Sequence, residues 1–227
     1  MGFFEEVRAL PPDPIFGLEE AFKLDPRANK VNLGAGIYKT ADLAPLTLTC
    51  VKRAQQIVIQ QGLPAQYLPI GGFPAFIAAA QELVFGSDYS KRIFACQTVG
   101  GTGALRVAAE FIADFVSKEI HVPDPTWDNH KRILSLSGLN VEYYPYYDRR
   151  HQDFSWEKMR GYLADLPERS AILLHGCCHN PTGADPTPGE WQEIVAFIKE
   201  RKLFPLVDLA YQGFAEGIEE DAFPIRL

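Results

Sequence analysis

The residues best suited to chemistry in this sequence come directly after a short apolar run. The run is residues 171–174, and the stretch that follows, residues 175–185, holds histidine, cysteine, asparagine and threonine side chains. An apolar run of this length between breakers predicts a buried strand of a parallel sheet. Pro181 and Gly183 then require a turn, because proline fixes φ and glycine permits a left-handed step. Asn180 would therefore present its amide at the carboxyl edge of a sheet, where open α/β proteins bind their ligands.

A carboxylate lies in a comparable place further along the chain. Residues 203–209 predict a second apolar strand, and Asp208 lies near its carboxyl end. Burying an acid there is costly unless a cation or a hydrogen-bond donor meets it. Tyr211 follows three positions later. The sequence thus predicts a cationic or donor partner for this acid.

A glycine-rich turn, Gly100-Gly101-Thr102-Gly103, precedes a strongly periodic segment. Such a turn presents free backbone N–H groups and the positive end of a helix dipole, which together suit a phosphate. Most glycine-rich turns bind nothing, however, and Arg106 stands where the dinucleotide fingerprint needs its last glycine. The residues expected on one buried face of the helix are Leu105, Ala108, Phe111, Ile112 and Phe115.

Trp127 lies in the loop 123–130, which follows a predicted strand at 120–122. At the ligand edge of a sheet, an indole can stack on a flat ring. The alternative is a tryptophan that caps the core, and the sequence by itself favours this second interpretation.

A zinc site is the third chemistry to consider, because His175, Cys177, Cys178 and His179 are close in sequence. Zinc sites usually space paired ligands by two to four residues and take a second pair from far along the chain. These four side chains crowd one strand end, and the adjacent cysteines would point to opposite faces of a strand. We therefore expect no metal, and we expect the cysteines to act as small apolar residues.

Two kinds of element alternate through most of the chain. The predicted helices are 48–61, 73–85, 105–115, 156–163 and 188–198, and the predicted strands are 93–98, 120–122, 141–146, 171–174 and 203–209. This alternation predicts an α/β fold with a mostly parallel sheet and helices on both faces. Residues 1–45 are proline-rich and weakly periodic. We expect this arm to be extended at 11–14 and to contact another subunit, because it buries too little surface to fold alone.

Composition excludes several classes of protein. Of the 227 residues, 47% are apolar and 22% charged, which supports a sizeable core and disfavours disorder. The net charge of −7 and the lack of a basic run disfavour a nucleic-acid surface. No apolar stretch approaches the ~20 residues of a membrane span. The N-terminus lacks the features of a signal peptide, and four cysteines suggest no disulfide framework, so we expect a cytoplasmic protein.

Six motifs in one order resemble the aspartate and aromatic-amino-acid aminotransferases. They are residues 32–38, 67–71, 97–104, 125–131, 175–183 and 208–214. Each motif alone has low specificity, but the likeness covers almost all of the chain with compatible spacing. The resemblance implies pyridoxal 5'-phosphate as cofactor, the large domain of the pyridoxal-phosphate transferase fold type I, and a homodimer.

The resemblance also implies roles for individual residues. Gly101 and Thr102 would hold the cofactor phosphate at the helix N-terminus, and Trp127 would stack on the pyridine ring. Asp208 would pair with the protonated ring nitrogen, which keeps the ring cationic and able to accept electrons. His130 would support Asp208 from behind.

Further roles concern the phenolic oxygen of the ring, the second subunit and the substrate. Asn180 and Tyr211 would bond the phenolic oxygen. Tyr67 would reach the phosphate of the other subunit's cofactor, so the active site would need a dimer. The residues expected on the substrate side are Gly36, Ile37, Trp127 and Asn180.

The family's Schiff-base lysine is expected beyond Tyr211, in a motif that contains serine and lysine. The 227 residues contain no such motif, and we expect Lys199 and Lys202 on a solvated helix face. The sequence therefore offers no catalytic residue. We expect a fragment of a longer enzyme, with residues 1–45 as an arm and small-domain segment and 46–227 as the first part of the large domain.

The functional expectation has two parts. In the full-length protein we expect transamination between aspartate or an aromatic amino acid and 2-oxoglutarate. Alone, the chain is expected to be inactive, because the lysine both anchors the cofactor and moves the proton. The alternatives are another class I aminotransferase or a lyase of the same fold, a non-catalytic cofactor-binding module, and one part of a split enzyme, whose unpaired sheet edge would favour a complementary chain.

Overall fold

The computed structural model describes residues 2, 4–5, 7, 14–32, 36–62, 64, 66–87 and 92–227. Residues 11–13 of the proline-rich arm and 33–35 of the first glycine motif, for which we made predictions, lie outside this set. The chain forms two compact units, Met1–Gln66 and Tyr67–Leu227. The domain boundary expected between residues 45 and 46 remains a prediction.

The first unit contains two helices, α1 (Pro14–Leu24) and α2 (Thr49–Gln61). The second agrees with the predicted helix at 48–61 and ends at Gly62, whose φ of 55° is left-handed. The first was not predicted, and the expectation of an extended chain at Pro14 is wrong. Proline suits the first turn of a helix, where its missing N–H has no intrahelical partner, so Pro14 begins α1.

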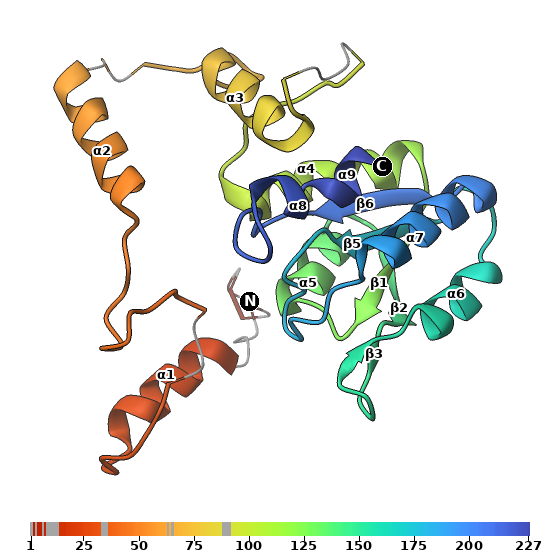
Figure 1. Ribbon diagram of the computed structural model, residues 1–227, viewed down its shortest axis with the longest axis horizontal. Helices are drawn as coiled ribbons and strands as arrows, with labels where there is room; N and C mark the ends of the chain where they lie inside the picture. Colours follow the sequence, from red (N-terminus) through yellow and green to blue (C-terminus); the bar gives the residue numbers. More distant parts are fainter. Residues whose placement is uncertain are drawn as a thin grey trace. The chain divides into compact units, whose positions relative to one another are not determined.

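The second unit is built on a four-stranded sheet in the order β2-β1-β5-β6 (Figure 1). Its strands are β1 (Glu119–Asp124), β2 (Asn140–Pro145), β5 (Ala171–His175) and β6 (Phe204–Asp208). All three pairings are parallel, as the alternation of elements predicts. The α/β fold class is therefore confirmed.

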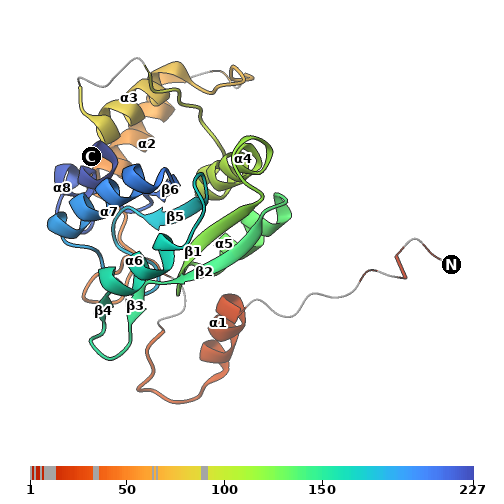
Figure 2. The ribbon, with the colours of Figure 1, turned by 90° about the vertical axis from the view of Figure 1, so that its right-hand side faces the viewer.

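Helices cover both faces of this sheet. Figure 2 shows α6 (Trp156–Ala164) and α7 (Pro188–Arg201) on one side of the strands, and α4 (Gly100–Phe115) and α5 (Asp128–Leu136) on the other. Successive strand residues point to opposite faces. Ile172 and Leu174 of β5 accordingly join the core cluster with α6 and α7, while Ala171 and Leu173 join the cluster with α4 and α5.

Two expectations of secondary structure are wrong. Residues 93–98 form no strand, because no described strand lies beside them. On α4 the buried side chains are Leu105, Ala109, Ile112 and Ala113, whereas Phe111 and Phe115 are 52% and 69% exposed. The buried stripe still follows helical spacing, but it is rotated by about one position from the predicted face.

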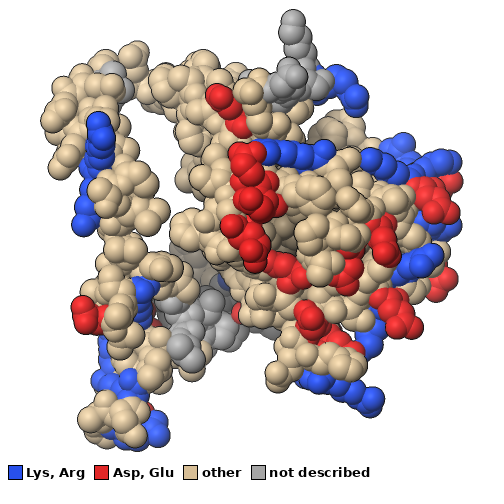
Figure 3. Space-filling view, in the orientation of Figure 1, with Lys and Arg blue, Asp and Glu red and all other residues tan. Residues whose placement is uncertain are grey.

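Short elements complete the second unit. A small hairpin, β3 (Tyr147–Asp148) with β4 (Asp153–Phe154), was not predicted. Helix α3 (Pro74–Phe85) precedes the glycine-rich turn, and α8 (Ile218–Asp221) and α9 (Phe223–Arg226) follow the sheet. Acidic side chains gather over α8 (Figure 3), whose first turn holds Glu219, Glu220 and Asp221. Arg226 Nε donates to the Val84 carbonyl at 2.7 Å, so α9 is tied to the end of α3.

None of the described helices is long and apolar enough to cross a membrane. All four cysteines carry free thiols. The cytoplasmic location remains a prediction made from the sequence.

Candidate active site

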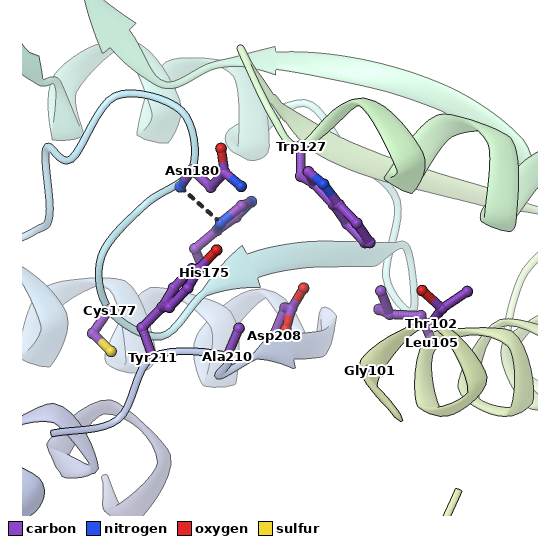
Figure 4. A pocket seen from close by; sticks show the side chains of 10 residues that line it. All are labelled: Gly101, Thr102, Leu105, Trp127, His175, Cys177, Asn180, Asp208, Ala210 and Tyr211. Atoms are coloured by element: carbon purple, nitrogen blue, oxygen red, sulfur yellow. Dashed lines mark hydrogen bonds between the residues drawn. The ribbon is translucent and has the colours of Figure 1, made fainter. Parts of the chain in front are cut away.

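A cavity of about 190 Å³ lies at the carboxyl edge of the sheet (Figure 4). Its walls come from the N-terminus of α4 and from the segments that follow β1, β5 and β6. The described residues that line it are Gly101, Thr102, Leu105, Trp127, His175, Cys177, Asn180, Asp208, Ala210 and Tyr211. Six of these were predicted as cofactor-binding residues from motifs that lie far apart in the sequence.

Parallel pairing explains why these segments meet. β5 and β6 run in register, so His175 at the end of one strand stands beside Asp208 at the end of the other. The carboxyl ends of parallel strands lie at one edge of a sheet, which is where ligands bind in this class of fold. Gly176 lets β5 and β6 approach closely, because a Cβ there would lie 2.7 Å from Leu209 Cδ1.

The N-terminus of α4 offers an anion site. The helix has no side-chain cap. The N–H groups of Gly101 and Thr102 have no acceptor among the described residues. An added Cβ at Gly101 would meet no atom within 4 Å, so the backbone is open to the cavity. Free N–H groups and the helix dipole together favour a phosphate or another anion at this place.

Asp208 has the donor partner that its burial at a strand end requires. Its Oδ2 lies 3.0 Å from His130 Nε2, and the His130 ring is fully buried. Three further residues extend this contact into a chain of hydrogen bonds. Thr126 Oγ1 lies 2.8 Å from His130 Nδ1 and 3.0 Å from His175 Nε2, and the backbone N–H of Asn180 points to His175 Nδ1 at 3.4 Å.

The donors in this chain of contacts can be assigned from one end to the other. A carboxylate only accepts, so His130 donates from Nε2 and accepts at Nδ1 from the Thr126 hydroxyl. Thr126 then accepts from His175 Nε2–H, and His175 accepts at Nδ1 from Asn180. Thr126 and both histidines then each have one donor and one acceptor role. The chain uses Oδ2 of Asp208 and leaves Oδ1 to a further partner.

Burial keeps His175 neutral. It lowers the pKa of His175 to about 4, and the neighbouring His130 lowers it further while Asp208 opposes the shift. His179 behaves in the same way: burial and then His175 lower its pKa to about 3. The His179 ring stacks on Tyr146 with centroids 3.9 Å apart, and its Nδ1 contacts Thr182 Oγ1 at 2.8 Å. Both histidines are therefore packed and uncharged near neutral pH.

Trp127 has a position that suits both interpretations given to it, and its stacking on a flat ring stays a prediction. It is partly buried and packs against the core cluster under α4 and α5, and it also lines the cavity. Its ring meets His130 edge-on at 5.3 Å. Figure 4 shows its indole among the side chains that line the cavity.

The turn after β5 has the conformation that Pro181 and Gly183 indicate. Gly183 has a φ of 67° and donates to the His179 carbonyl at 2.7 Å. The Asp185 carboxylate accepts from the N–H groups of Cys178 at 2.6 Å and His179 at 2.8 Å. The turn is thereby fixed, and with it the position from which Asn180 enters the cavity.

The cysteines near the cavity are poor metal ligands. Burial raises the pKa of Cys177 to about 12 and also raises the pKa of Cys178, so both are thiols near neutral pH. Over the part of the chain that the structure describes, no three histidine, cysteine or acidic side chains form a metal-binding group.

Three predicted site residues lie elsewhere. Tyr67 is fully exposed and does not line the cavity, and its expected contact with a second subunit stays a prediction. Gly36 and Ile37 belong to the first unit, and their expected substrate contacts also stay predictions. The sequence missed Thr126 and the hydrogen-bonding role of His175. The available signal for Thr126 was its spacing of four residues before His130.

Comparison with known proteins gives the family. The family described as "Aminotransferase class I and II" matches residues 28–227. The aspartate aminotransferase of Salmonella typhi is 43% identical over 98% of this chain and 58% of its own length. Thus the chain spans 58% of the length of this curated relative.

Solved structures agree in fold. The aromatic amino acid aminotransferase of Burkholderia cenocepacia J2315 has a TM-score of 0.94 and 42% identity, over 99% of this chain and 58% of that one. The aromatic-amino-acid aminotransferase of Burkholderia pseudomallei, covalently bound to pyridoxal phosphate, has a TM-score of 0.95 and 39% identity, over 100% of this chain and 58% of that one. The chain belongs to the family of class I and II aminotransferases.

Proposed function

We propose that this chain forms the cofactor half of an enzyme that uses pyridoxal 5'-phosphate for transamination. The observation that carries the proposal is the juxtaposition of the Asp208–His130 pair with the uncapped N-terminus of α4 in one cavity. A phosphorylated pyridine needs an anion site at one end and an acid for its ring nitrogen. The cavity supplies both, with an indole between them.

Each residue then has a task that its surroundings allow. Gly101 and Thr102 bind the phosphate through backbone N–H groups. Trp127 covers one face of the ring. Asp208 accepts from the protonated ring nitrogen with the oxygen that His130 leaves free. When bound, pyridoxal phosphate supplies an electron sink for the electrons of the substrate's Cα–H bond.

Asn180 and Tyr211 line the cavity on the side away from α4. We assign the Asn180 amide and the Tyr211 hydroxyl as hydrogen-bond partners of the ring's phenolic oxygen. Two donors at that oxygen favour its ionised form, in the same way that donors lower the pKa of a carboxylate. Asp208 at the opposite end keeps the ring nitrogen protonated.

Aspartate or an aromatic amino acid, with 2-oxoglutarate, is the substrate pair that we propose for the whole protein. It is supported by the relatives, which are named as aspartate and aromatic amino acid aminotransferases. Gly36 and Ile37 are proposed to line the substrate side, and Tyr67 to reach the cofactor phosphate of a second subunit in a homodimer. A cytoplasmic location and the domain boundary at residue 45 belong to the same proposal.

The chain by itself is proposed to be inactive in transamination. None of the described residues that line the cavity is a lysine. Lysines of the second unit pair with acids at the surface instead, as Lys158 does with Asp148 and Lys202 with Glu168. Among the described residues, no amine is therefore placed to bond the cofactor or to carry a proton from the substrate.

The experiment is an absorbance scan of the purified chain mixed with pyridoxal phosphate, then dialysed, then reduced with borohydride. We expect reversible binding that dialysis removes, and no cofactor fixed to the protein by reduction. Cofactor that becomes protein-bound on reduction would show that a lysine does reach it, and the inactivity proposal would fail. No binding at any concentration would remove the cofactor proposal itself.

A second candidate function, one part of a split enzyme, is favoured by the edge of β6. Phe204 N–H donates to Ser170 at 2.9 Å and Gly176 N–H to the Asp208 carbonyl at 2.8 Å, so alternate residues of β6 face β5. The backbones of Pro205 and Val207 consequently face the other edge. No described strand pairs there.

Apolar hollows flank that edge on both faces of the sheet. One of about 390 Å³ is lined by Pro205 and Val207 with residues of α7, and one of about 380 Å³ by Phe111, Phe115 and Phe204. A further strand could pair with this edge, and helices on its two faces would fill both hollows. Such a strand with its helices is the repeating unit of an α/β fold. Co-expression with the C-terminal part of an aspartate aminotransferase tests this: a stable complex supports the split enzyme, and separate elution on gel filtration contradicts it.

A further inference from the structure

Asp221 is a buried carboxylate outside the cavity, and its side chain is only 4% exposed. It accepts hydrogen bonds from four backbone N–H groups of the preceding loop. Oδ2 takes Gly213 at 2.7 Å and Ala215 at 3.1 Å, and Oδ1 takes Glu216 at 3.0 Å and Gly217 at 3.4 Å. One side chain therefore organises the loop from 213 to 217.

The rest of this loop is also fixed. The N–H of Phe214 donates to the Tyr211 carbonyl at 3.0 Å. The Gln212 amide donates to the carbonyls of Leu83 and Ile218, both at 2.9 Å. The residues directly after Tyr211 are thus held by the side chains of Gln212 and Asp221, and Asp221 accepts the larger share of the hydrogen bonds.

Tyr211 itself lies between this loop and the end of β6. On the strand side, Leu209 packs closely on Gly176, where an added Cβ would lie 2.7 Å from Leu209 Cδ1. The Tyr211 ring is 41% exposed, and its hydroxyl has no hydrogen bond to the described part of the chain. Its direction into the cavity is consequently set by the backbone on either side of it.

We propose that Asp221 is a positioning residue for Tyr211. Its carboxylate fixes the loop that begins at Gly213, and this loop fixes the angle at which the Tyr211 hydroxyl enters the cavity. The consequence for cofactor binding rests on the proposed function, in which Tyr211 meets the ring's phenolic oxygen. An ionised carboxylate suits the task, because its two oxygens accept at about four lone-pair sites and donate nothing.

The test compares Asp221→Asn with Asp114→Asn as a matched control. Asparagine keeps the shape but replaces one accepting oxygen with an NH₂ group that cannot accept from the loop. Asp114 is an acid of α4 whose side chain is 69% exposed, so its variant makes the same change of charge outside the loop.

Two measurements need no cofactor: hydrogen exchange of the amides from 213 to 217, and nitration of Tyr211 by tetranitromethane, mapped by mass spectrometry. We expect Asp221→Asn to increase both rates by roughly tenfold, the effect of losing about one to two net hydrogen bonds. Asp114→Asn should change neither. Unchanged nitration of Tyr211 in Asp221→Asn overturns the proposal. If Asp221→Asn does not fold, Asp221→Glu replaces it, because the longer side chain moves the carboxylate outward. We expect the same increase in both rates, and unchanged nitration of Tyr211 would again overturn the proposal.

A double-mutant cycle separates positioning from general support of the fold. The affinity for pyridoxal phosphate is measured by quenching of tryptophan fluorescence in the wild type, Asp221→Asn, Tyr211→Phe and the double variant. Asp221→Asn should weaken binding roughly five- to tenfold when Tyr211 is present and add nothing when it is phenylalanine. Equal weakening in both backgrounds would overturn the proposal. If the wild type binds no cofactor, the proposed function fails, while exchange and nitration still decide the role of Asp221.

Discussion

His130 Nε2 donates to Asp208 Oδ2 across 3.0 Å, from a ring that is fully buried to a carboxylate that lines the cavity. The two residues are 78 positions apart in sequence. Because the donor is buried, it holds the carboxylate in one orientation. The free oxygen of Asp208 keeps its ability to hold a cation, and this relationship underlies the first prediction.

Asp208→Asn should weaken the binding of pyridoxal phosphate to the chain by about tenfold or more, because a charge-assisted contact with the ring nitrogen is replaced by a neutral one. Asp114→Asn is the matched control, since Asp114 is an exposed acid of α4, with only a distant contact of 4.0 Å to Lys118. Fluorescence titration of both variants measures the effect. Equal affinity of Asp208→Asn and the wild type would remove Asp208 from the cofactor site.

Thr126→Val should lower the free energy of unfolding by about 1–3 kcal/mol, because two buried imidazole nitrogens lose a partner while the volume stays nearly constant. The nitrogens are His130 Nδ1 and His175 Nε2. Thr49→Val, at the exposed first position of α2, provides the control. Urea unfolding of the two variants gives the difference. A change of less than about 0.5 kcal/mol, the scatter typical of surface substitutions, would contradict the assigned hydrogen-bond chain.

Stability should fall as the pH is lowered from about 6.5 toward 4. An unfolded histidine has a pKa near 6.5, whereas the folded pKa is about 4 for His175 and about 3 for His179. In this window the unfolded chain binds more protons than the folded one, so the free energy of unfolding rises with pH. Above about pH 6.5 the two histidines make their full contribution to the free energy of unfolding.

Urea unfolding at pH 7, 6 and 5 measures this slope. His179→Phe keeps an aromatic ring on Tyr146 but cannot titrate, so the variant should show a shallower pH dependence than the wild type. His151→Asn is the control, because the His151 side chain is 79% exposed. An unchanged slope in His179→Phe would mean that His179 is not the source.

Gly176→Ala should destabilise the second unit by about 1–3 kcal/mol, as expected for overpacking. The new Cβ would lie 2.7 Å from Leu209 Cδ1. Gly161→Ala is the opposite control: Gly161 lies in α6 and has no atom within 4 Å of its added Cβ. That variant should gain about 0.5–1 kcal/mol, because alanine favours a helix interior. The midpoints of thermal unfolding of the two variants should therefore shift in opposite directions from that of the wild type.

The sequence by itself determined the class of fold and most of the elements. Apolar runs such as 171–174 and helical spacing such as that after Pro188 are local signals, and a parallel sheet follows from their alternation. The glycine-rich turn before α4 and the turn at Pro181 and Gly183 are also local, because proline and glycine restrict the backbone wherever they stand.

Only the tertiary structure decided which strand-end residues meet and how their hydrogen bonds run. Thr126 contacts His175, 49 positions away, because β1 and β5 pair side by side, and no local pattern contains that contact. Residues 93–98 likewise form no strand although their composition favours one, because no described strand lies beside them. Strand pairing and burial of polar partners act between distant parts of the chain, so they appear only when the chain is folded.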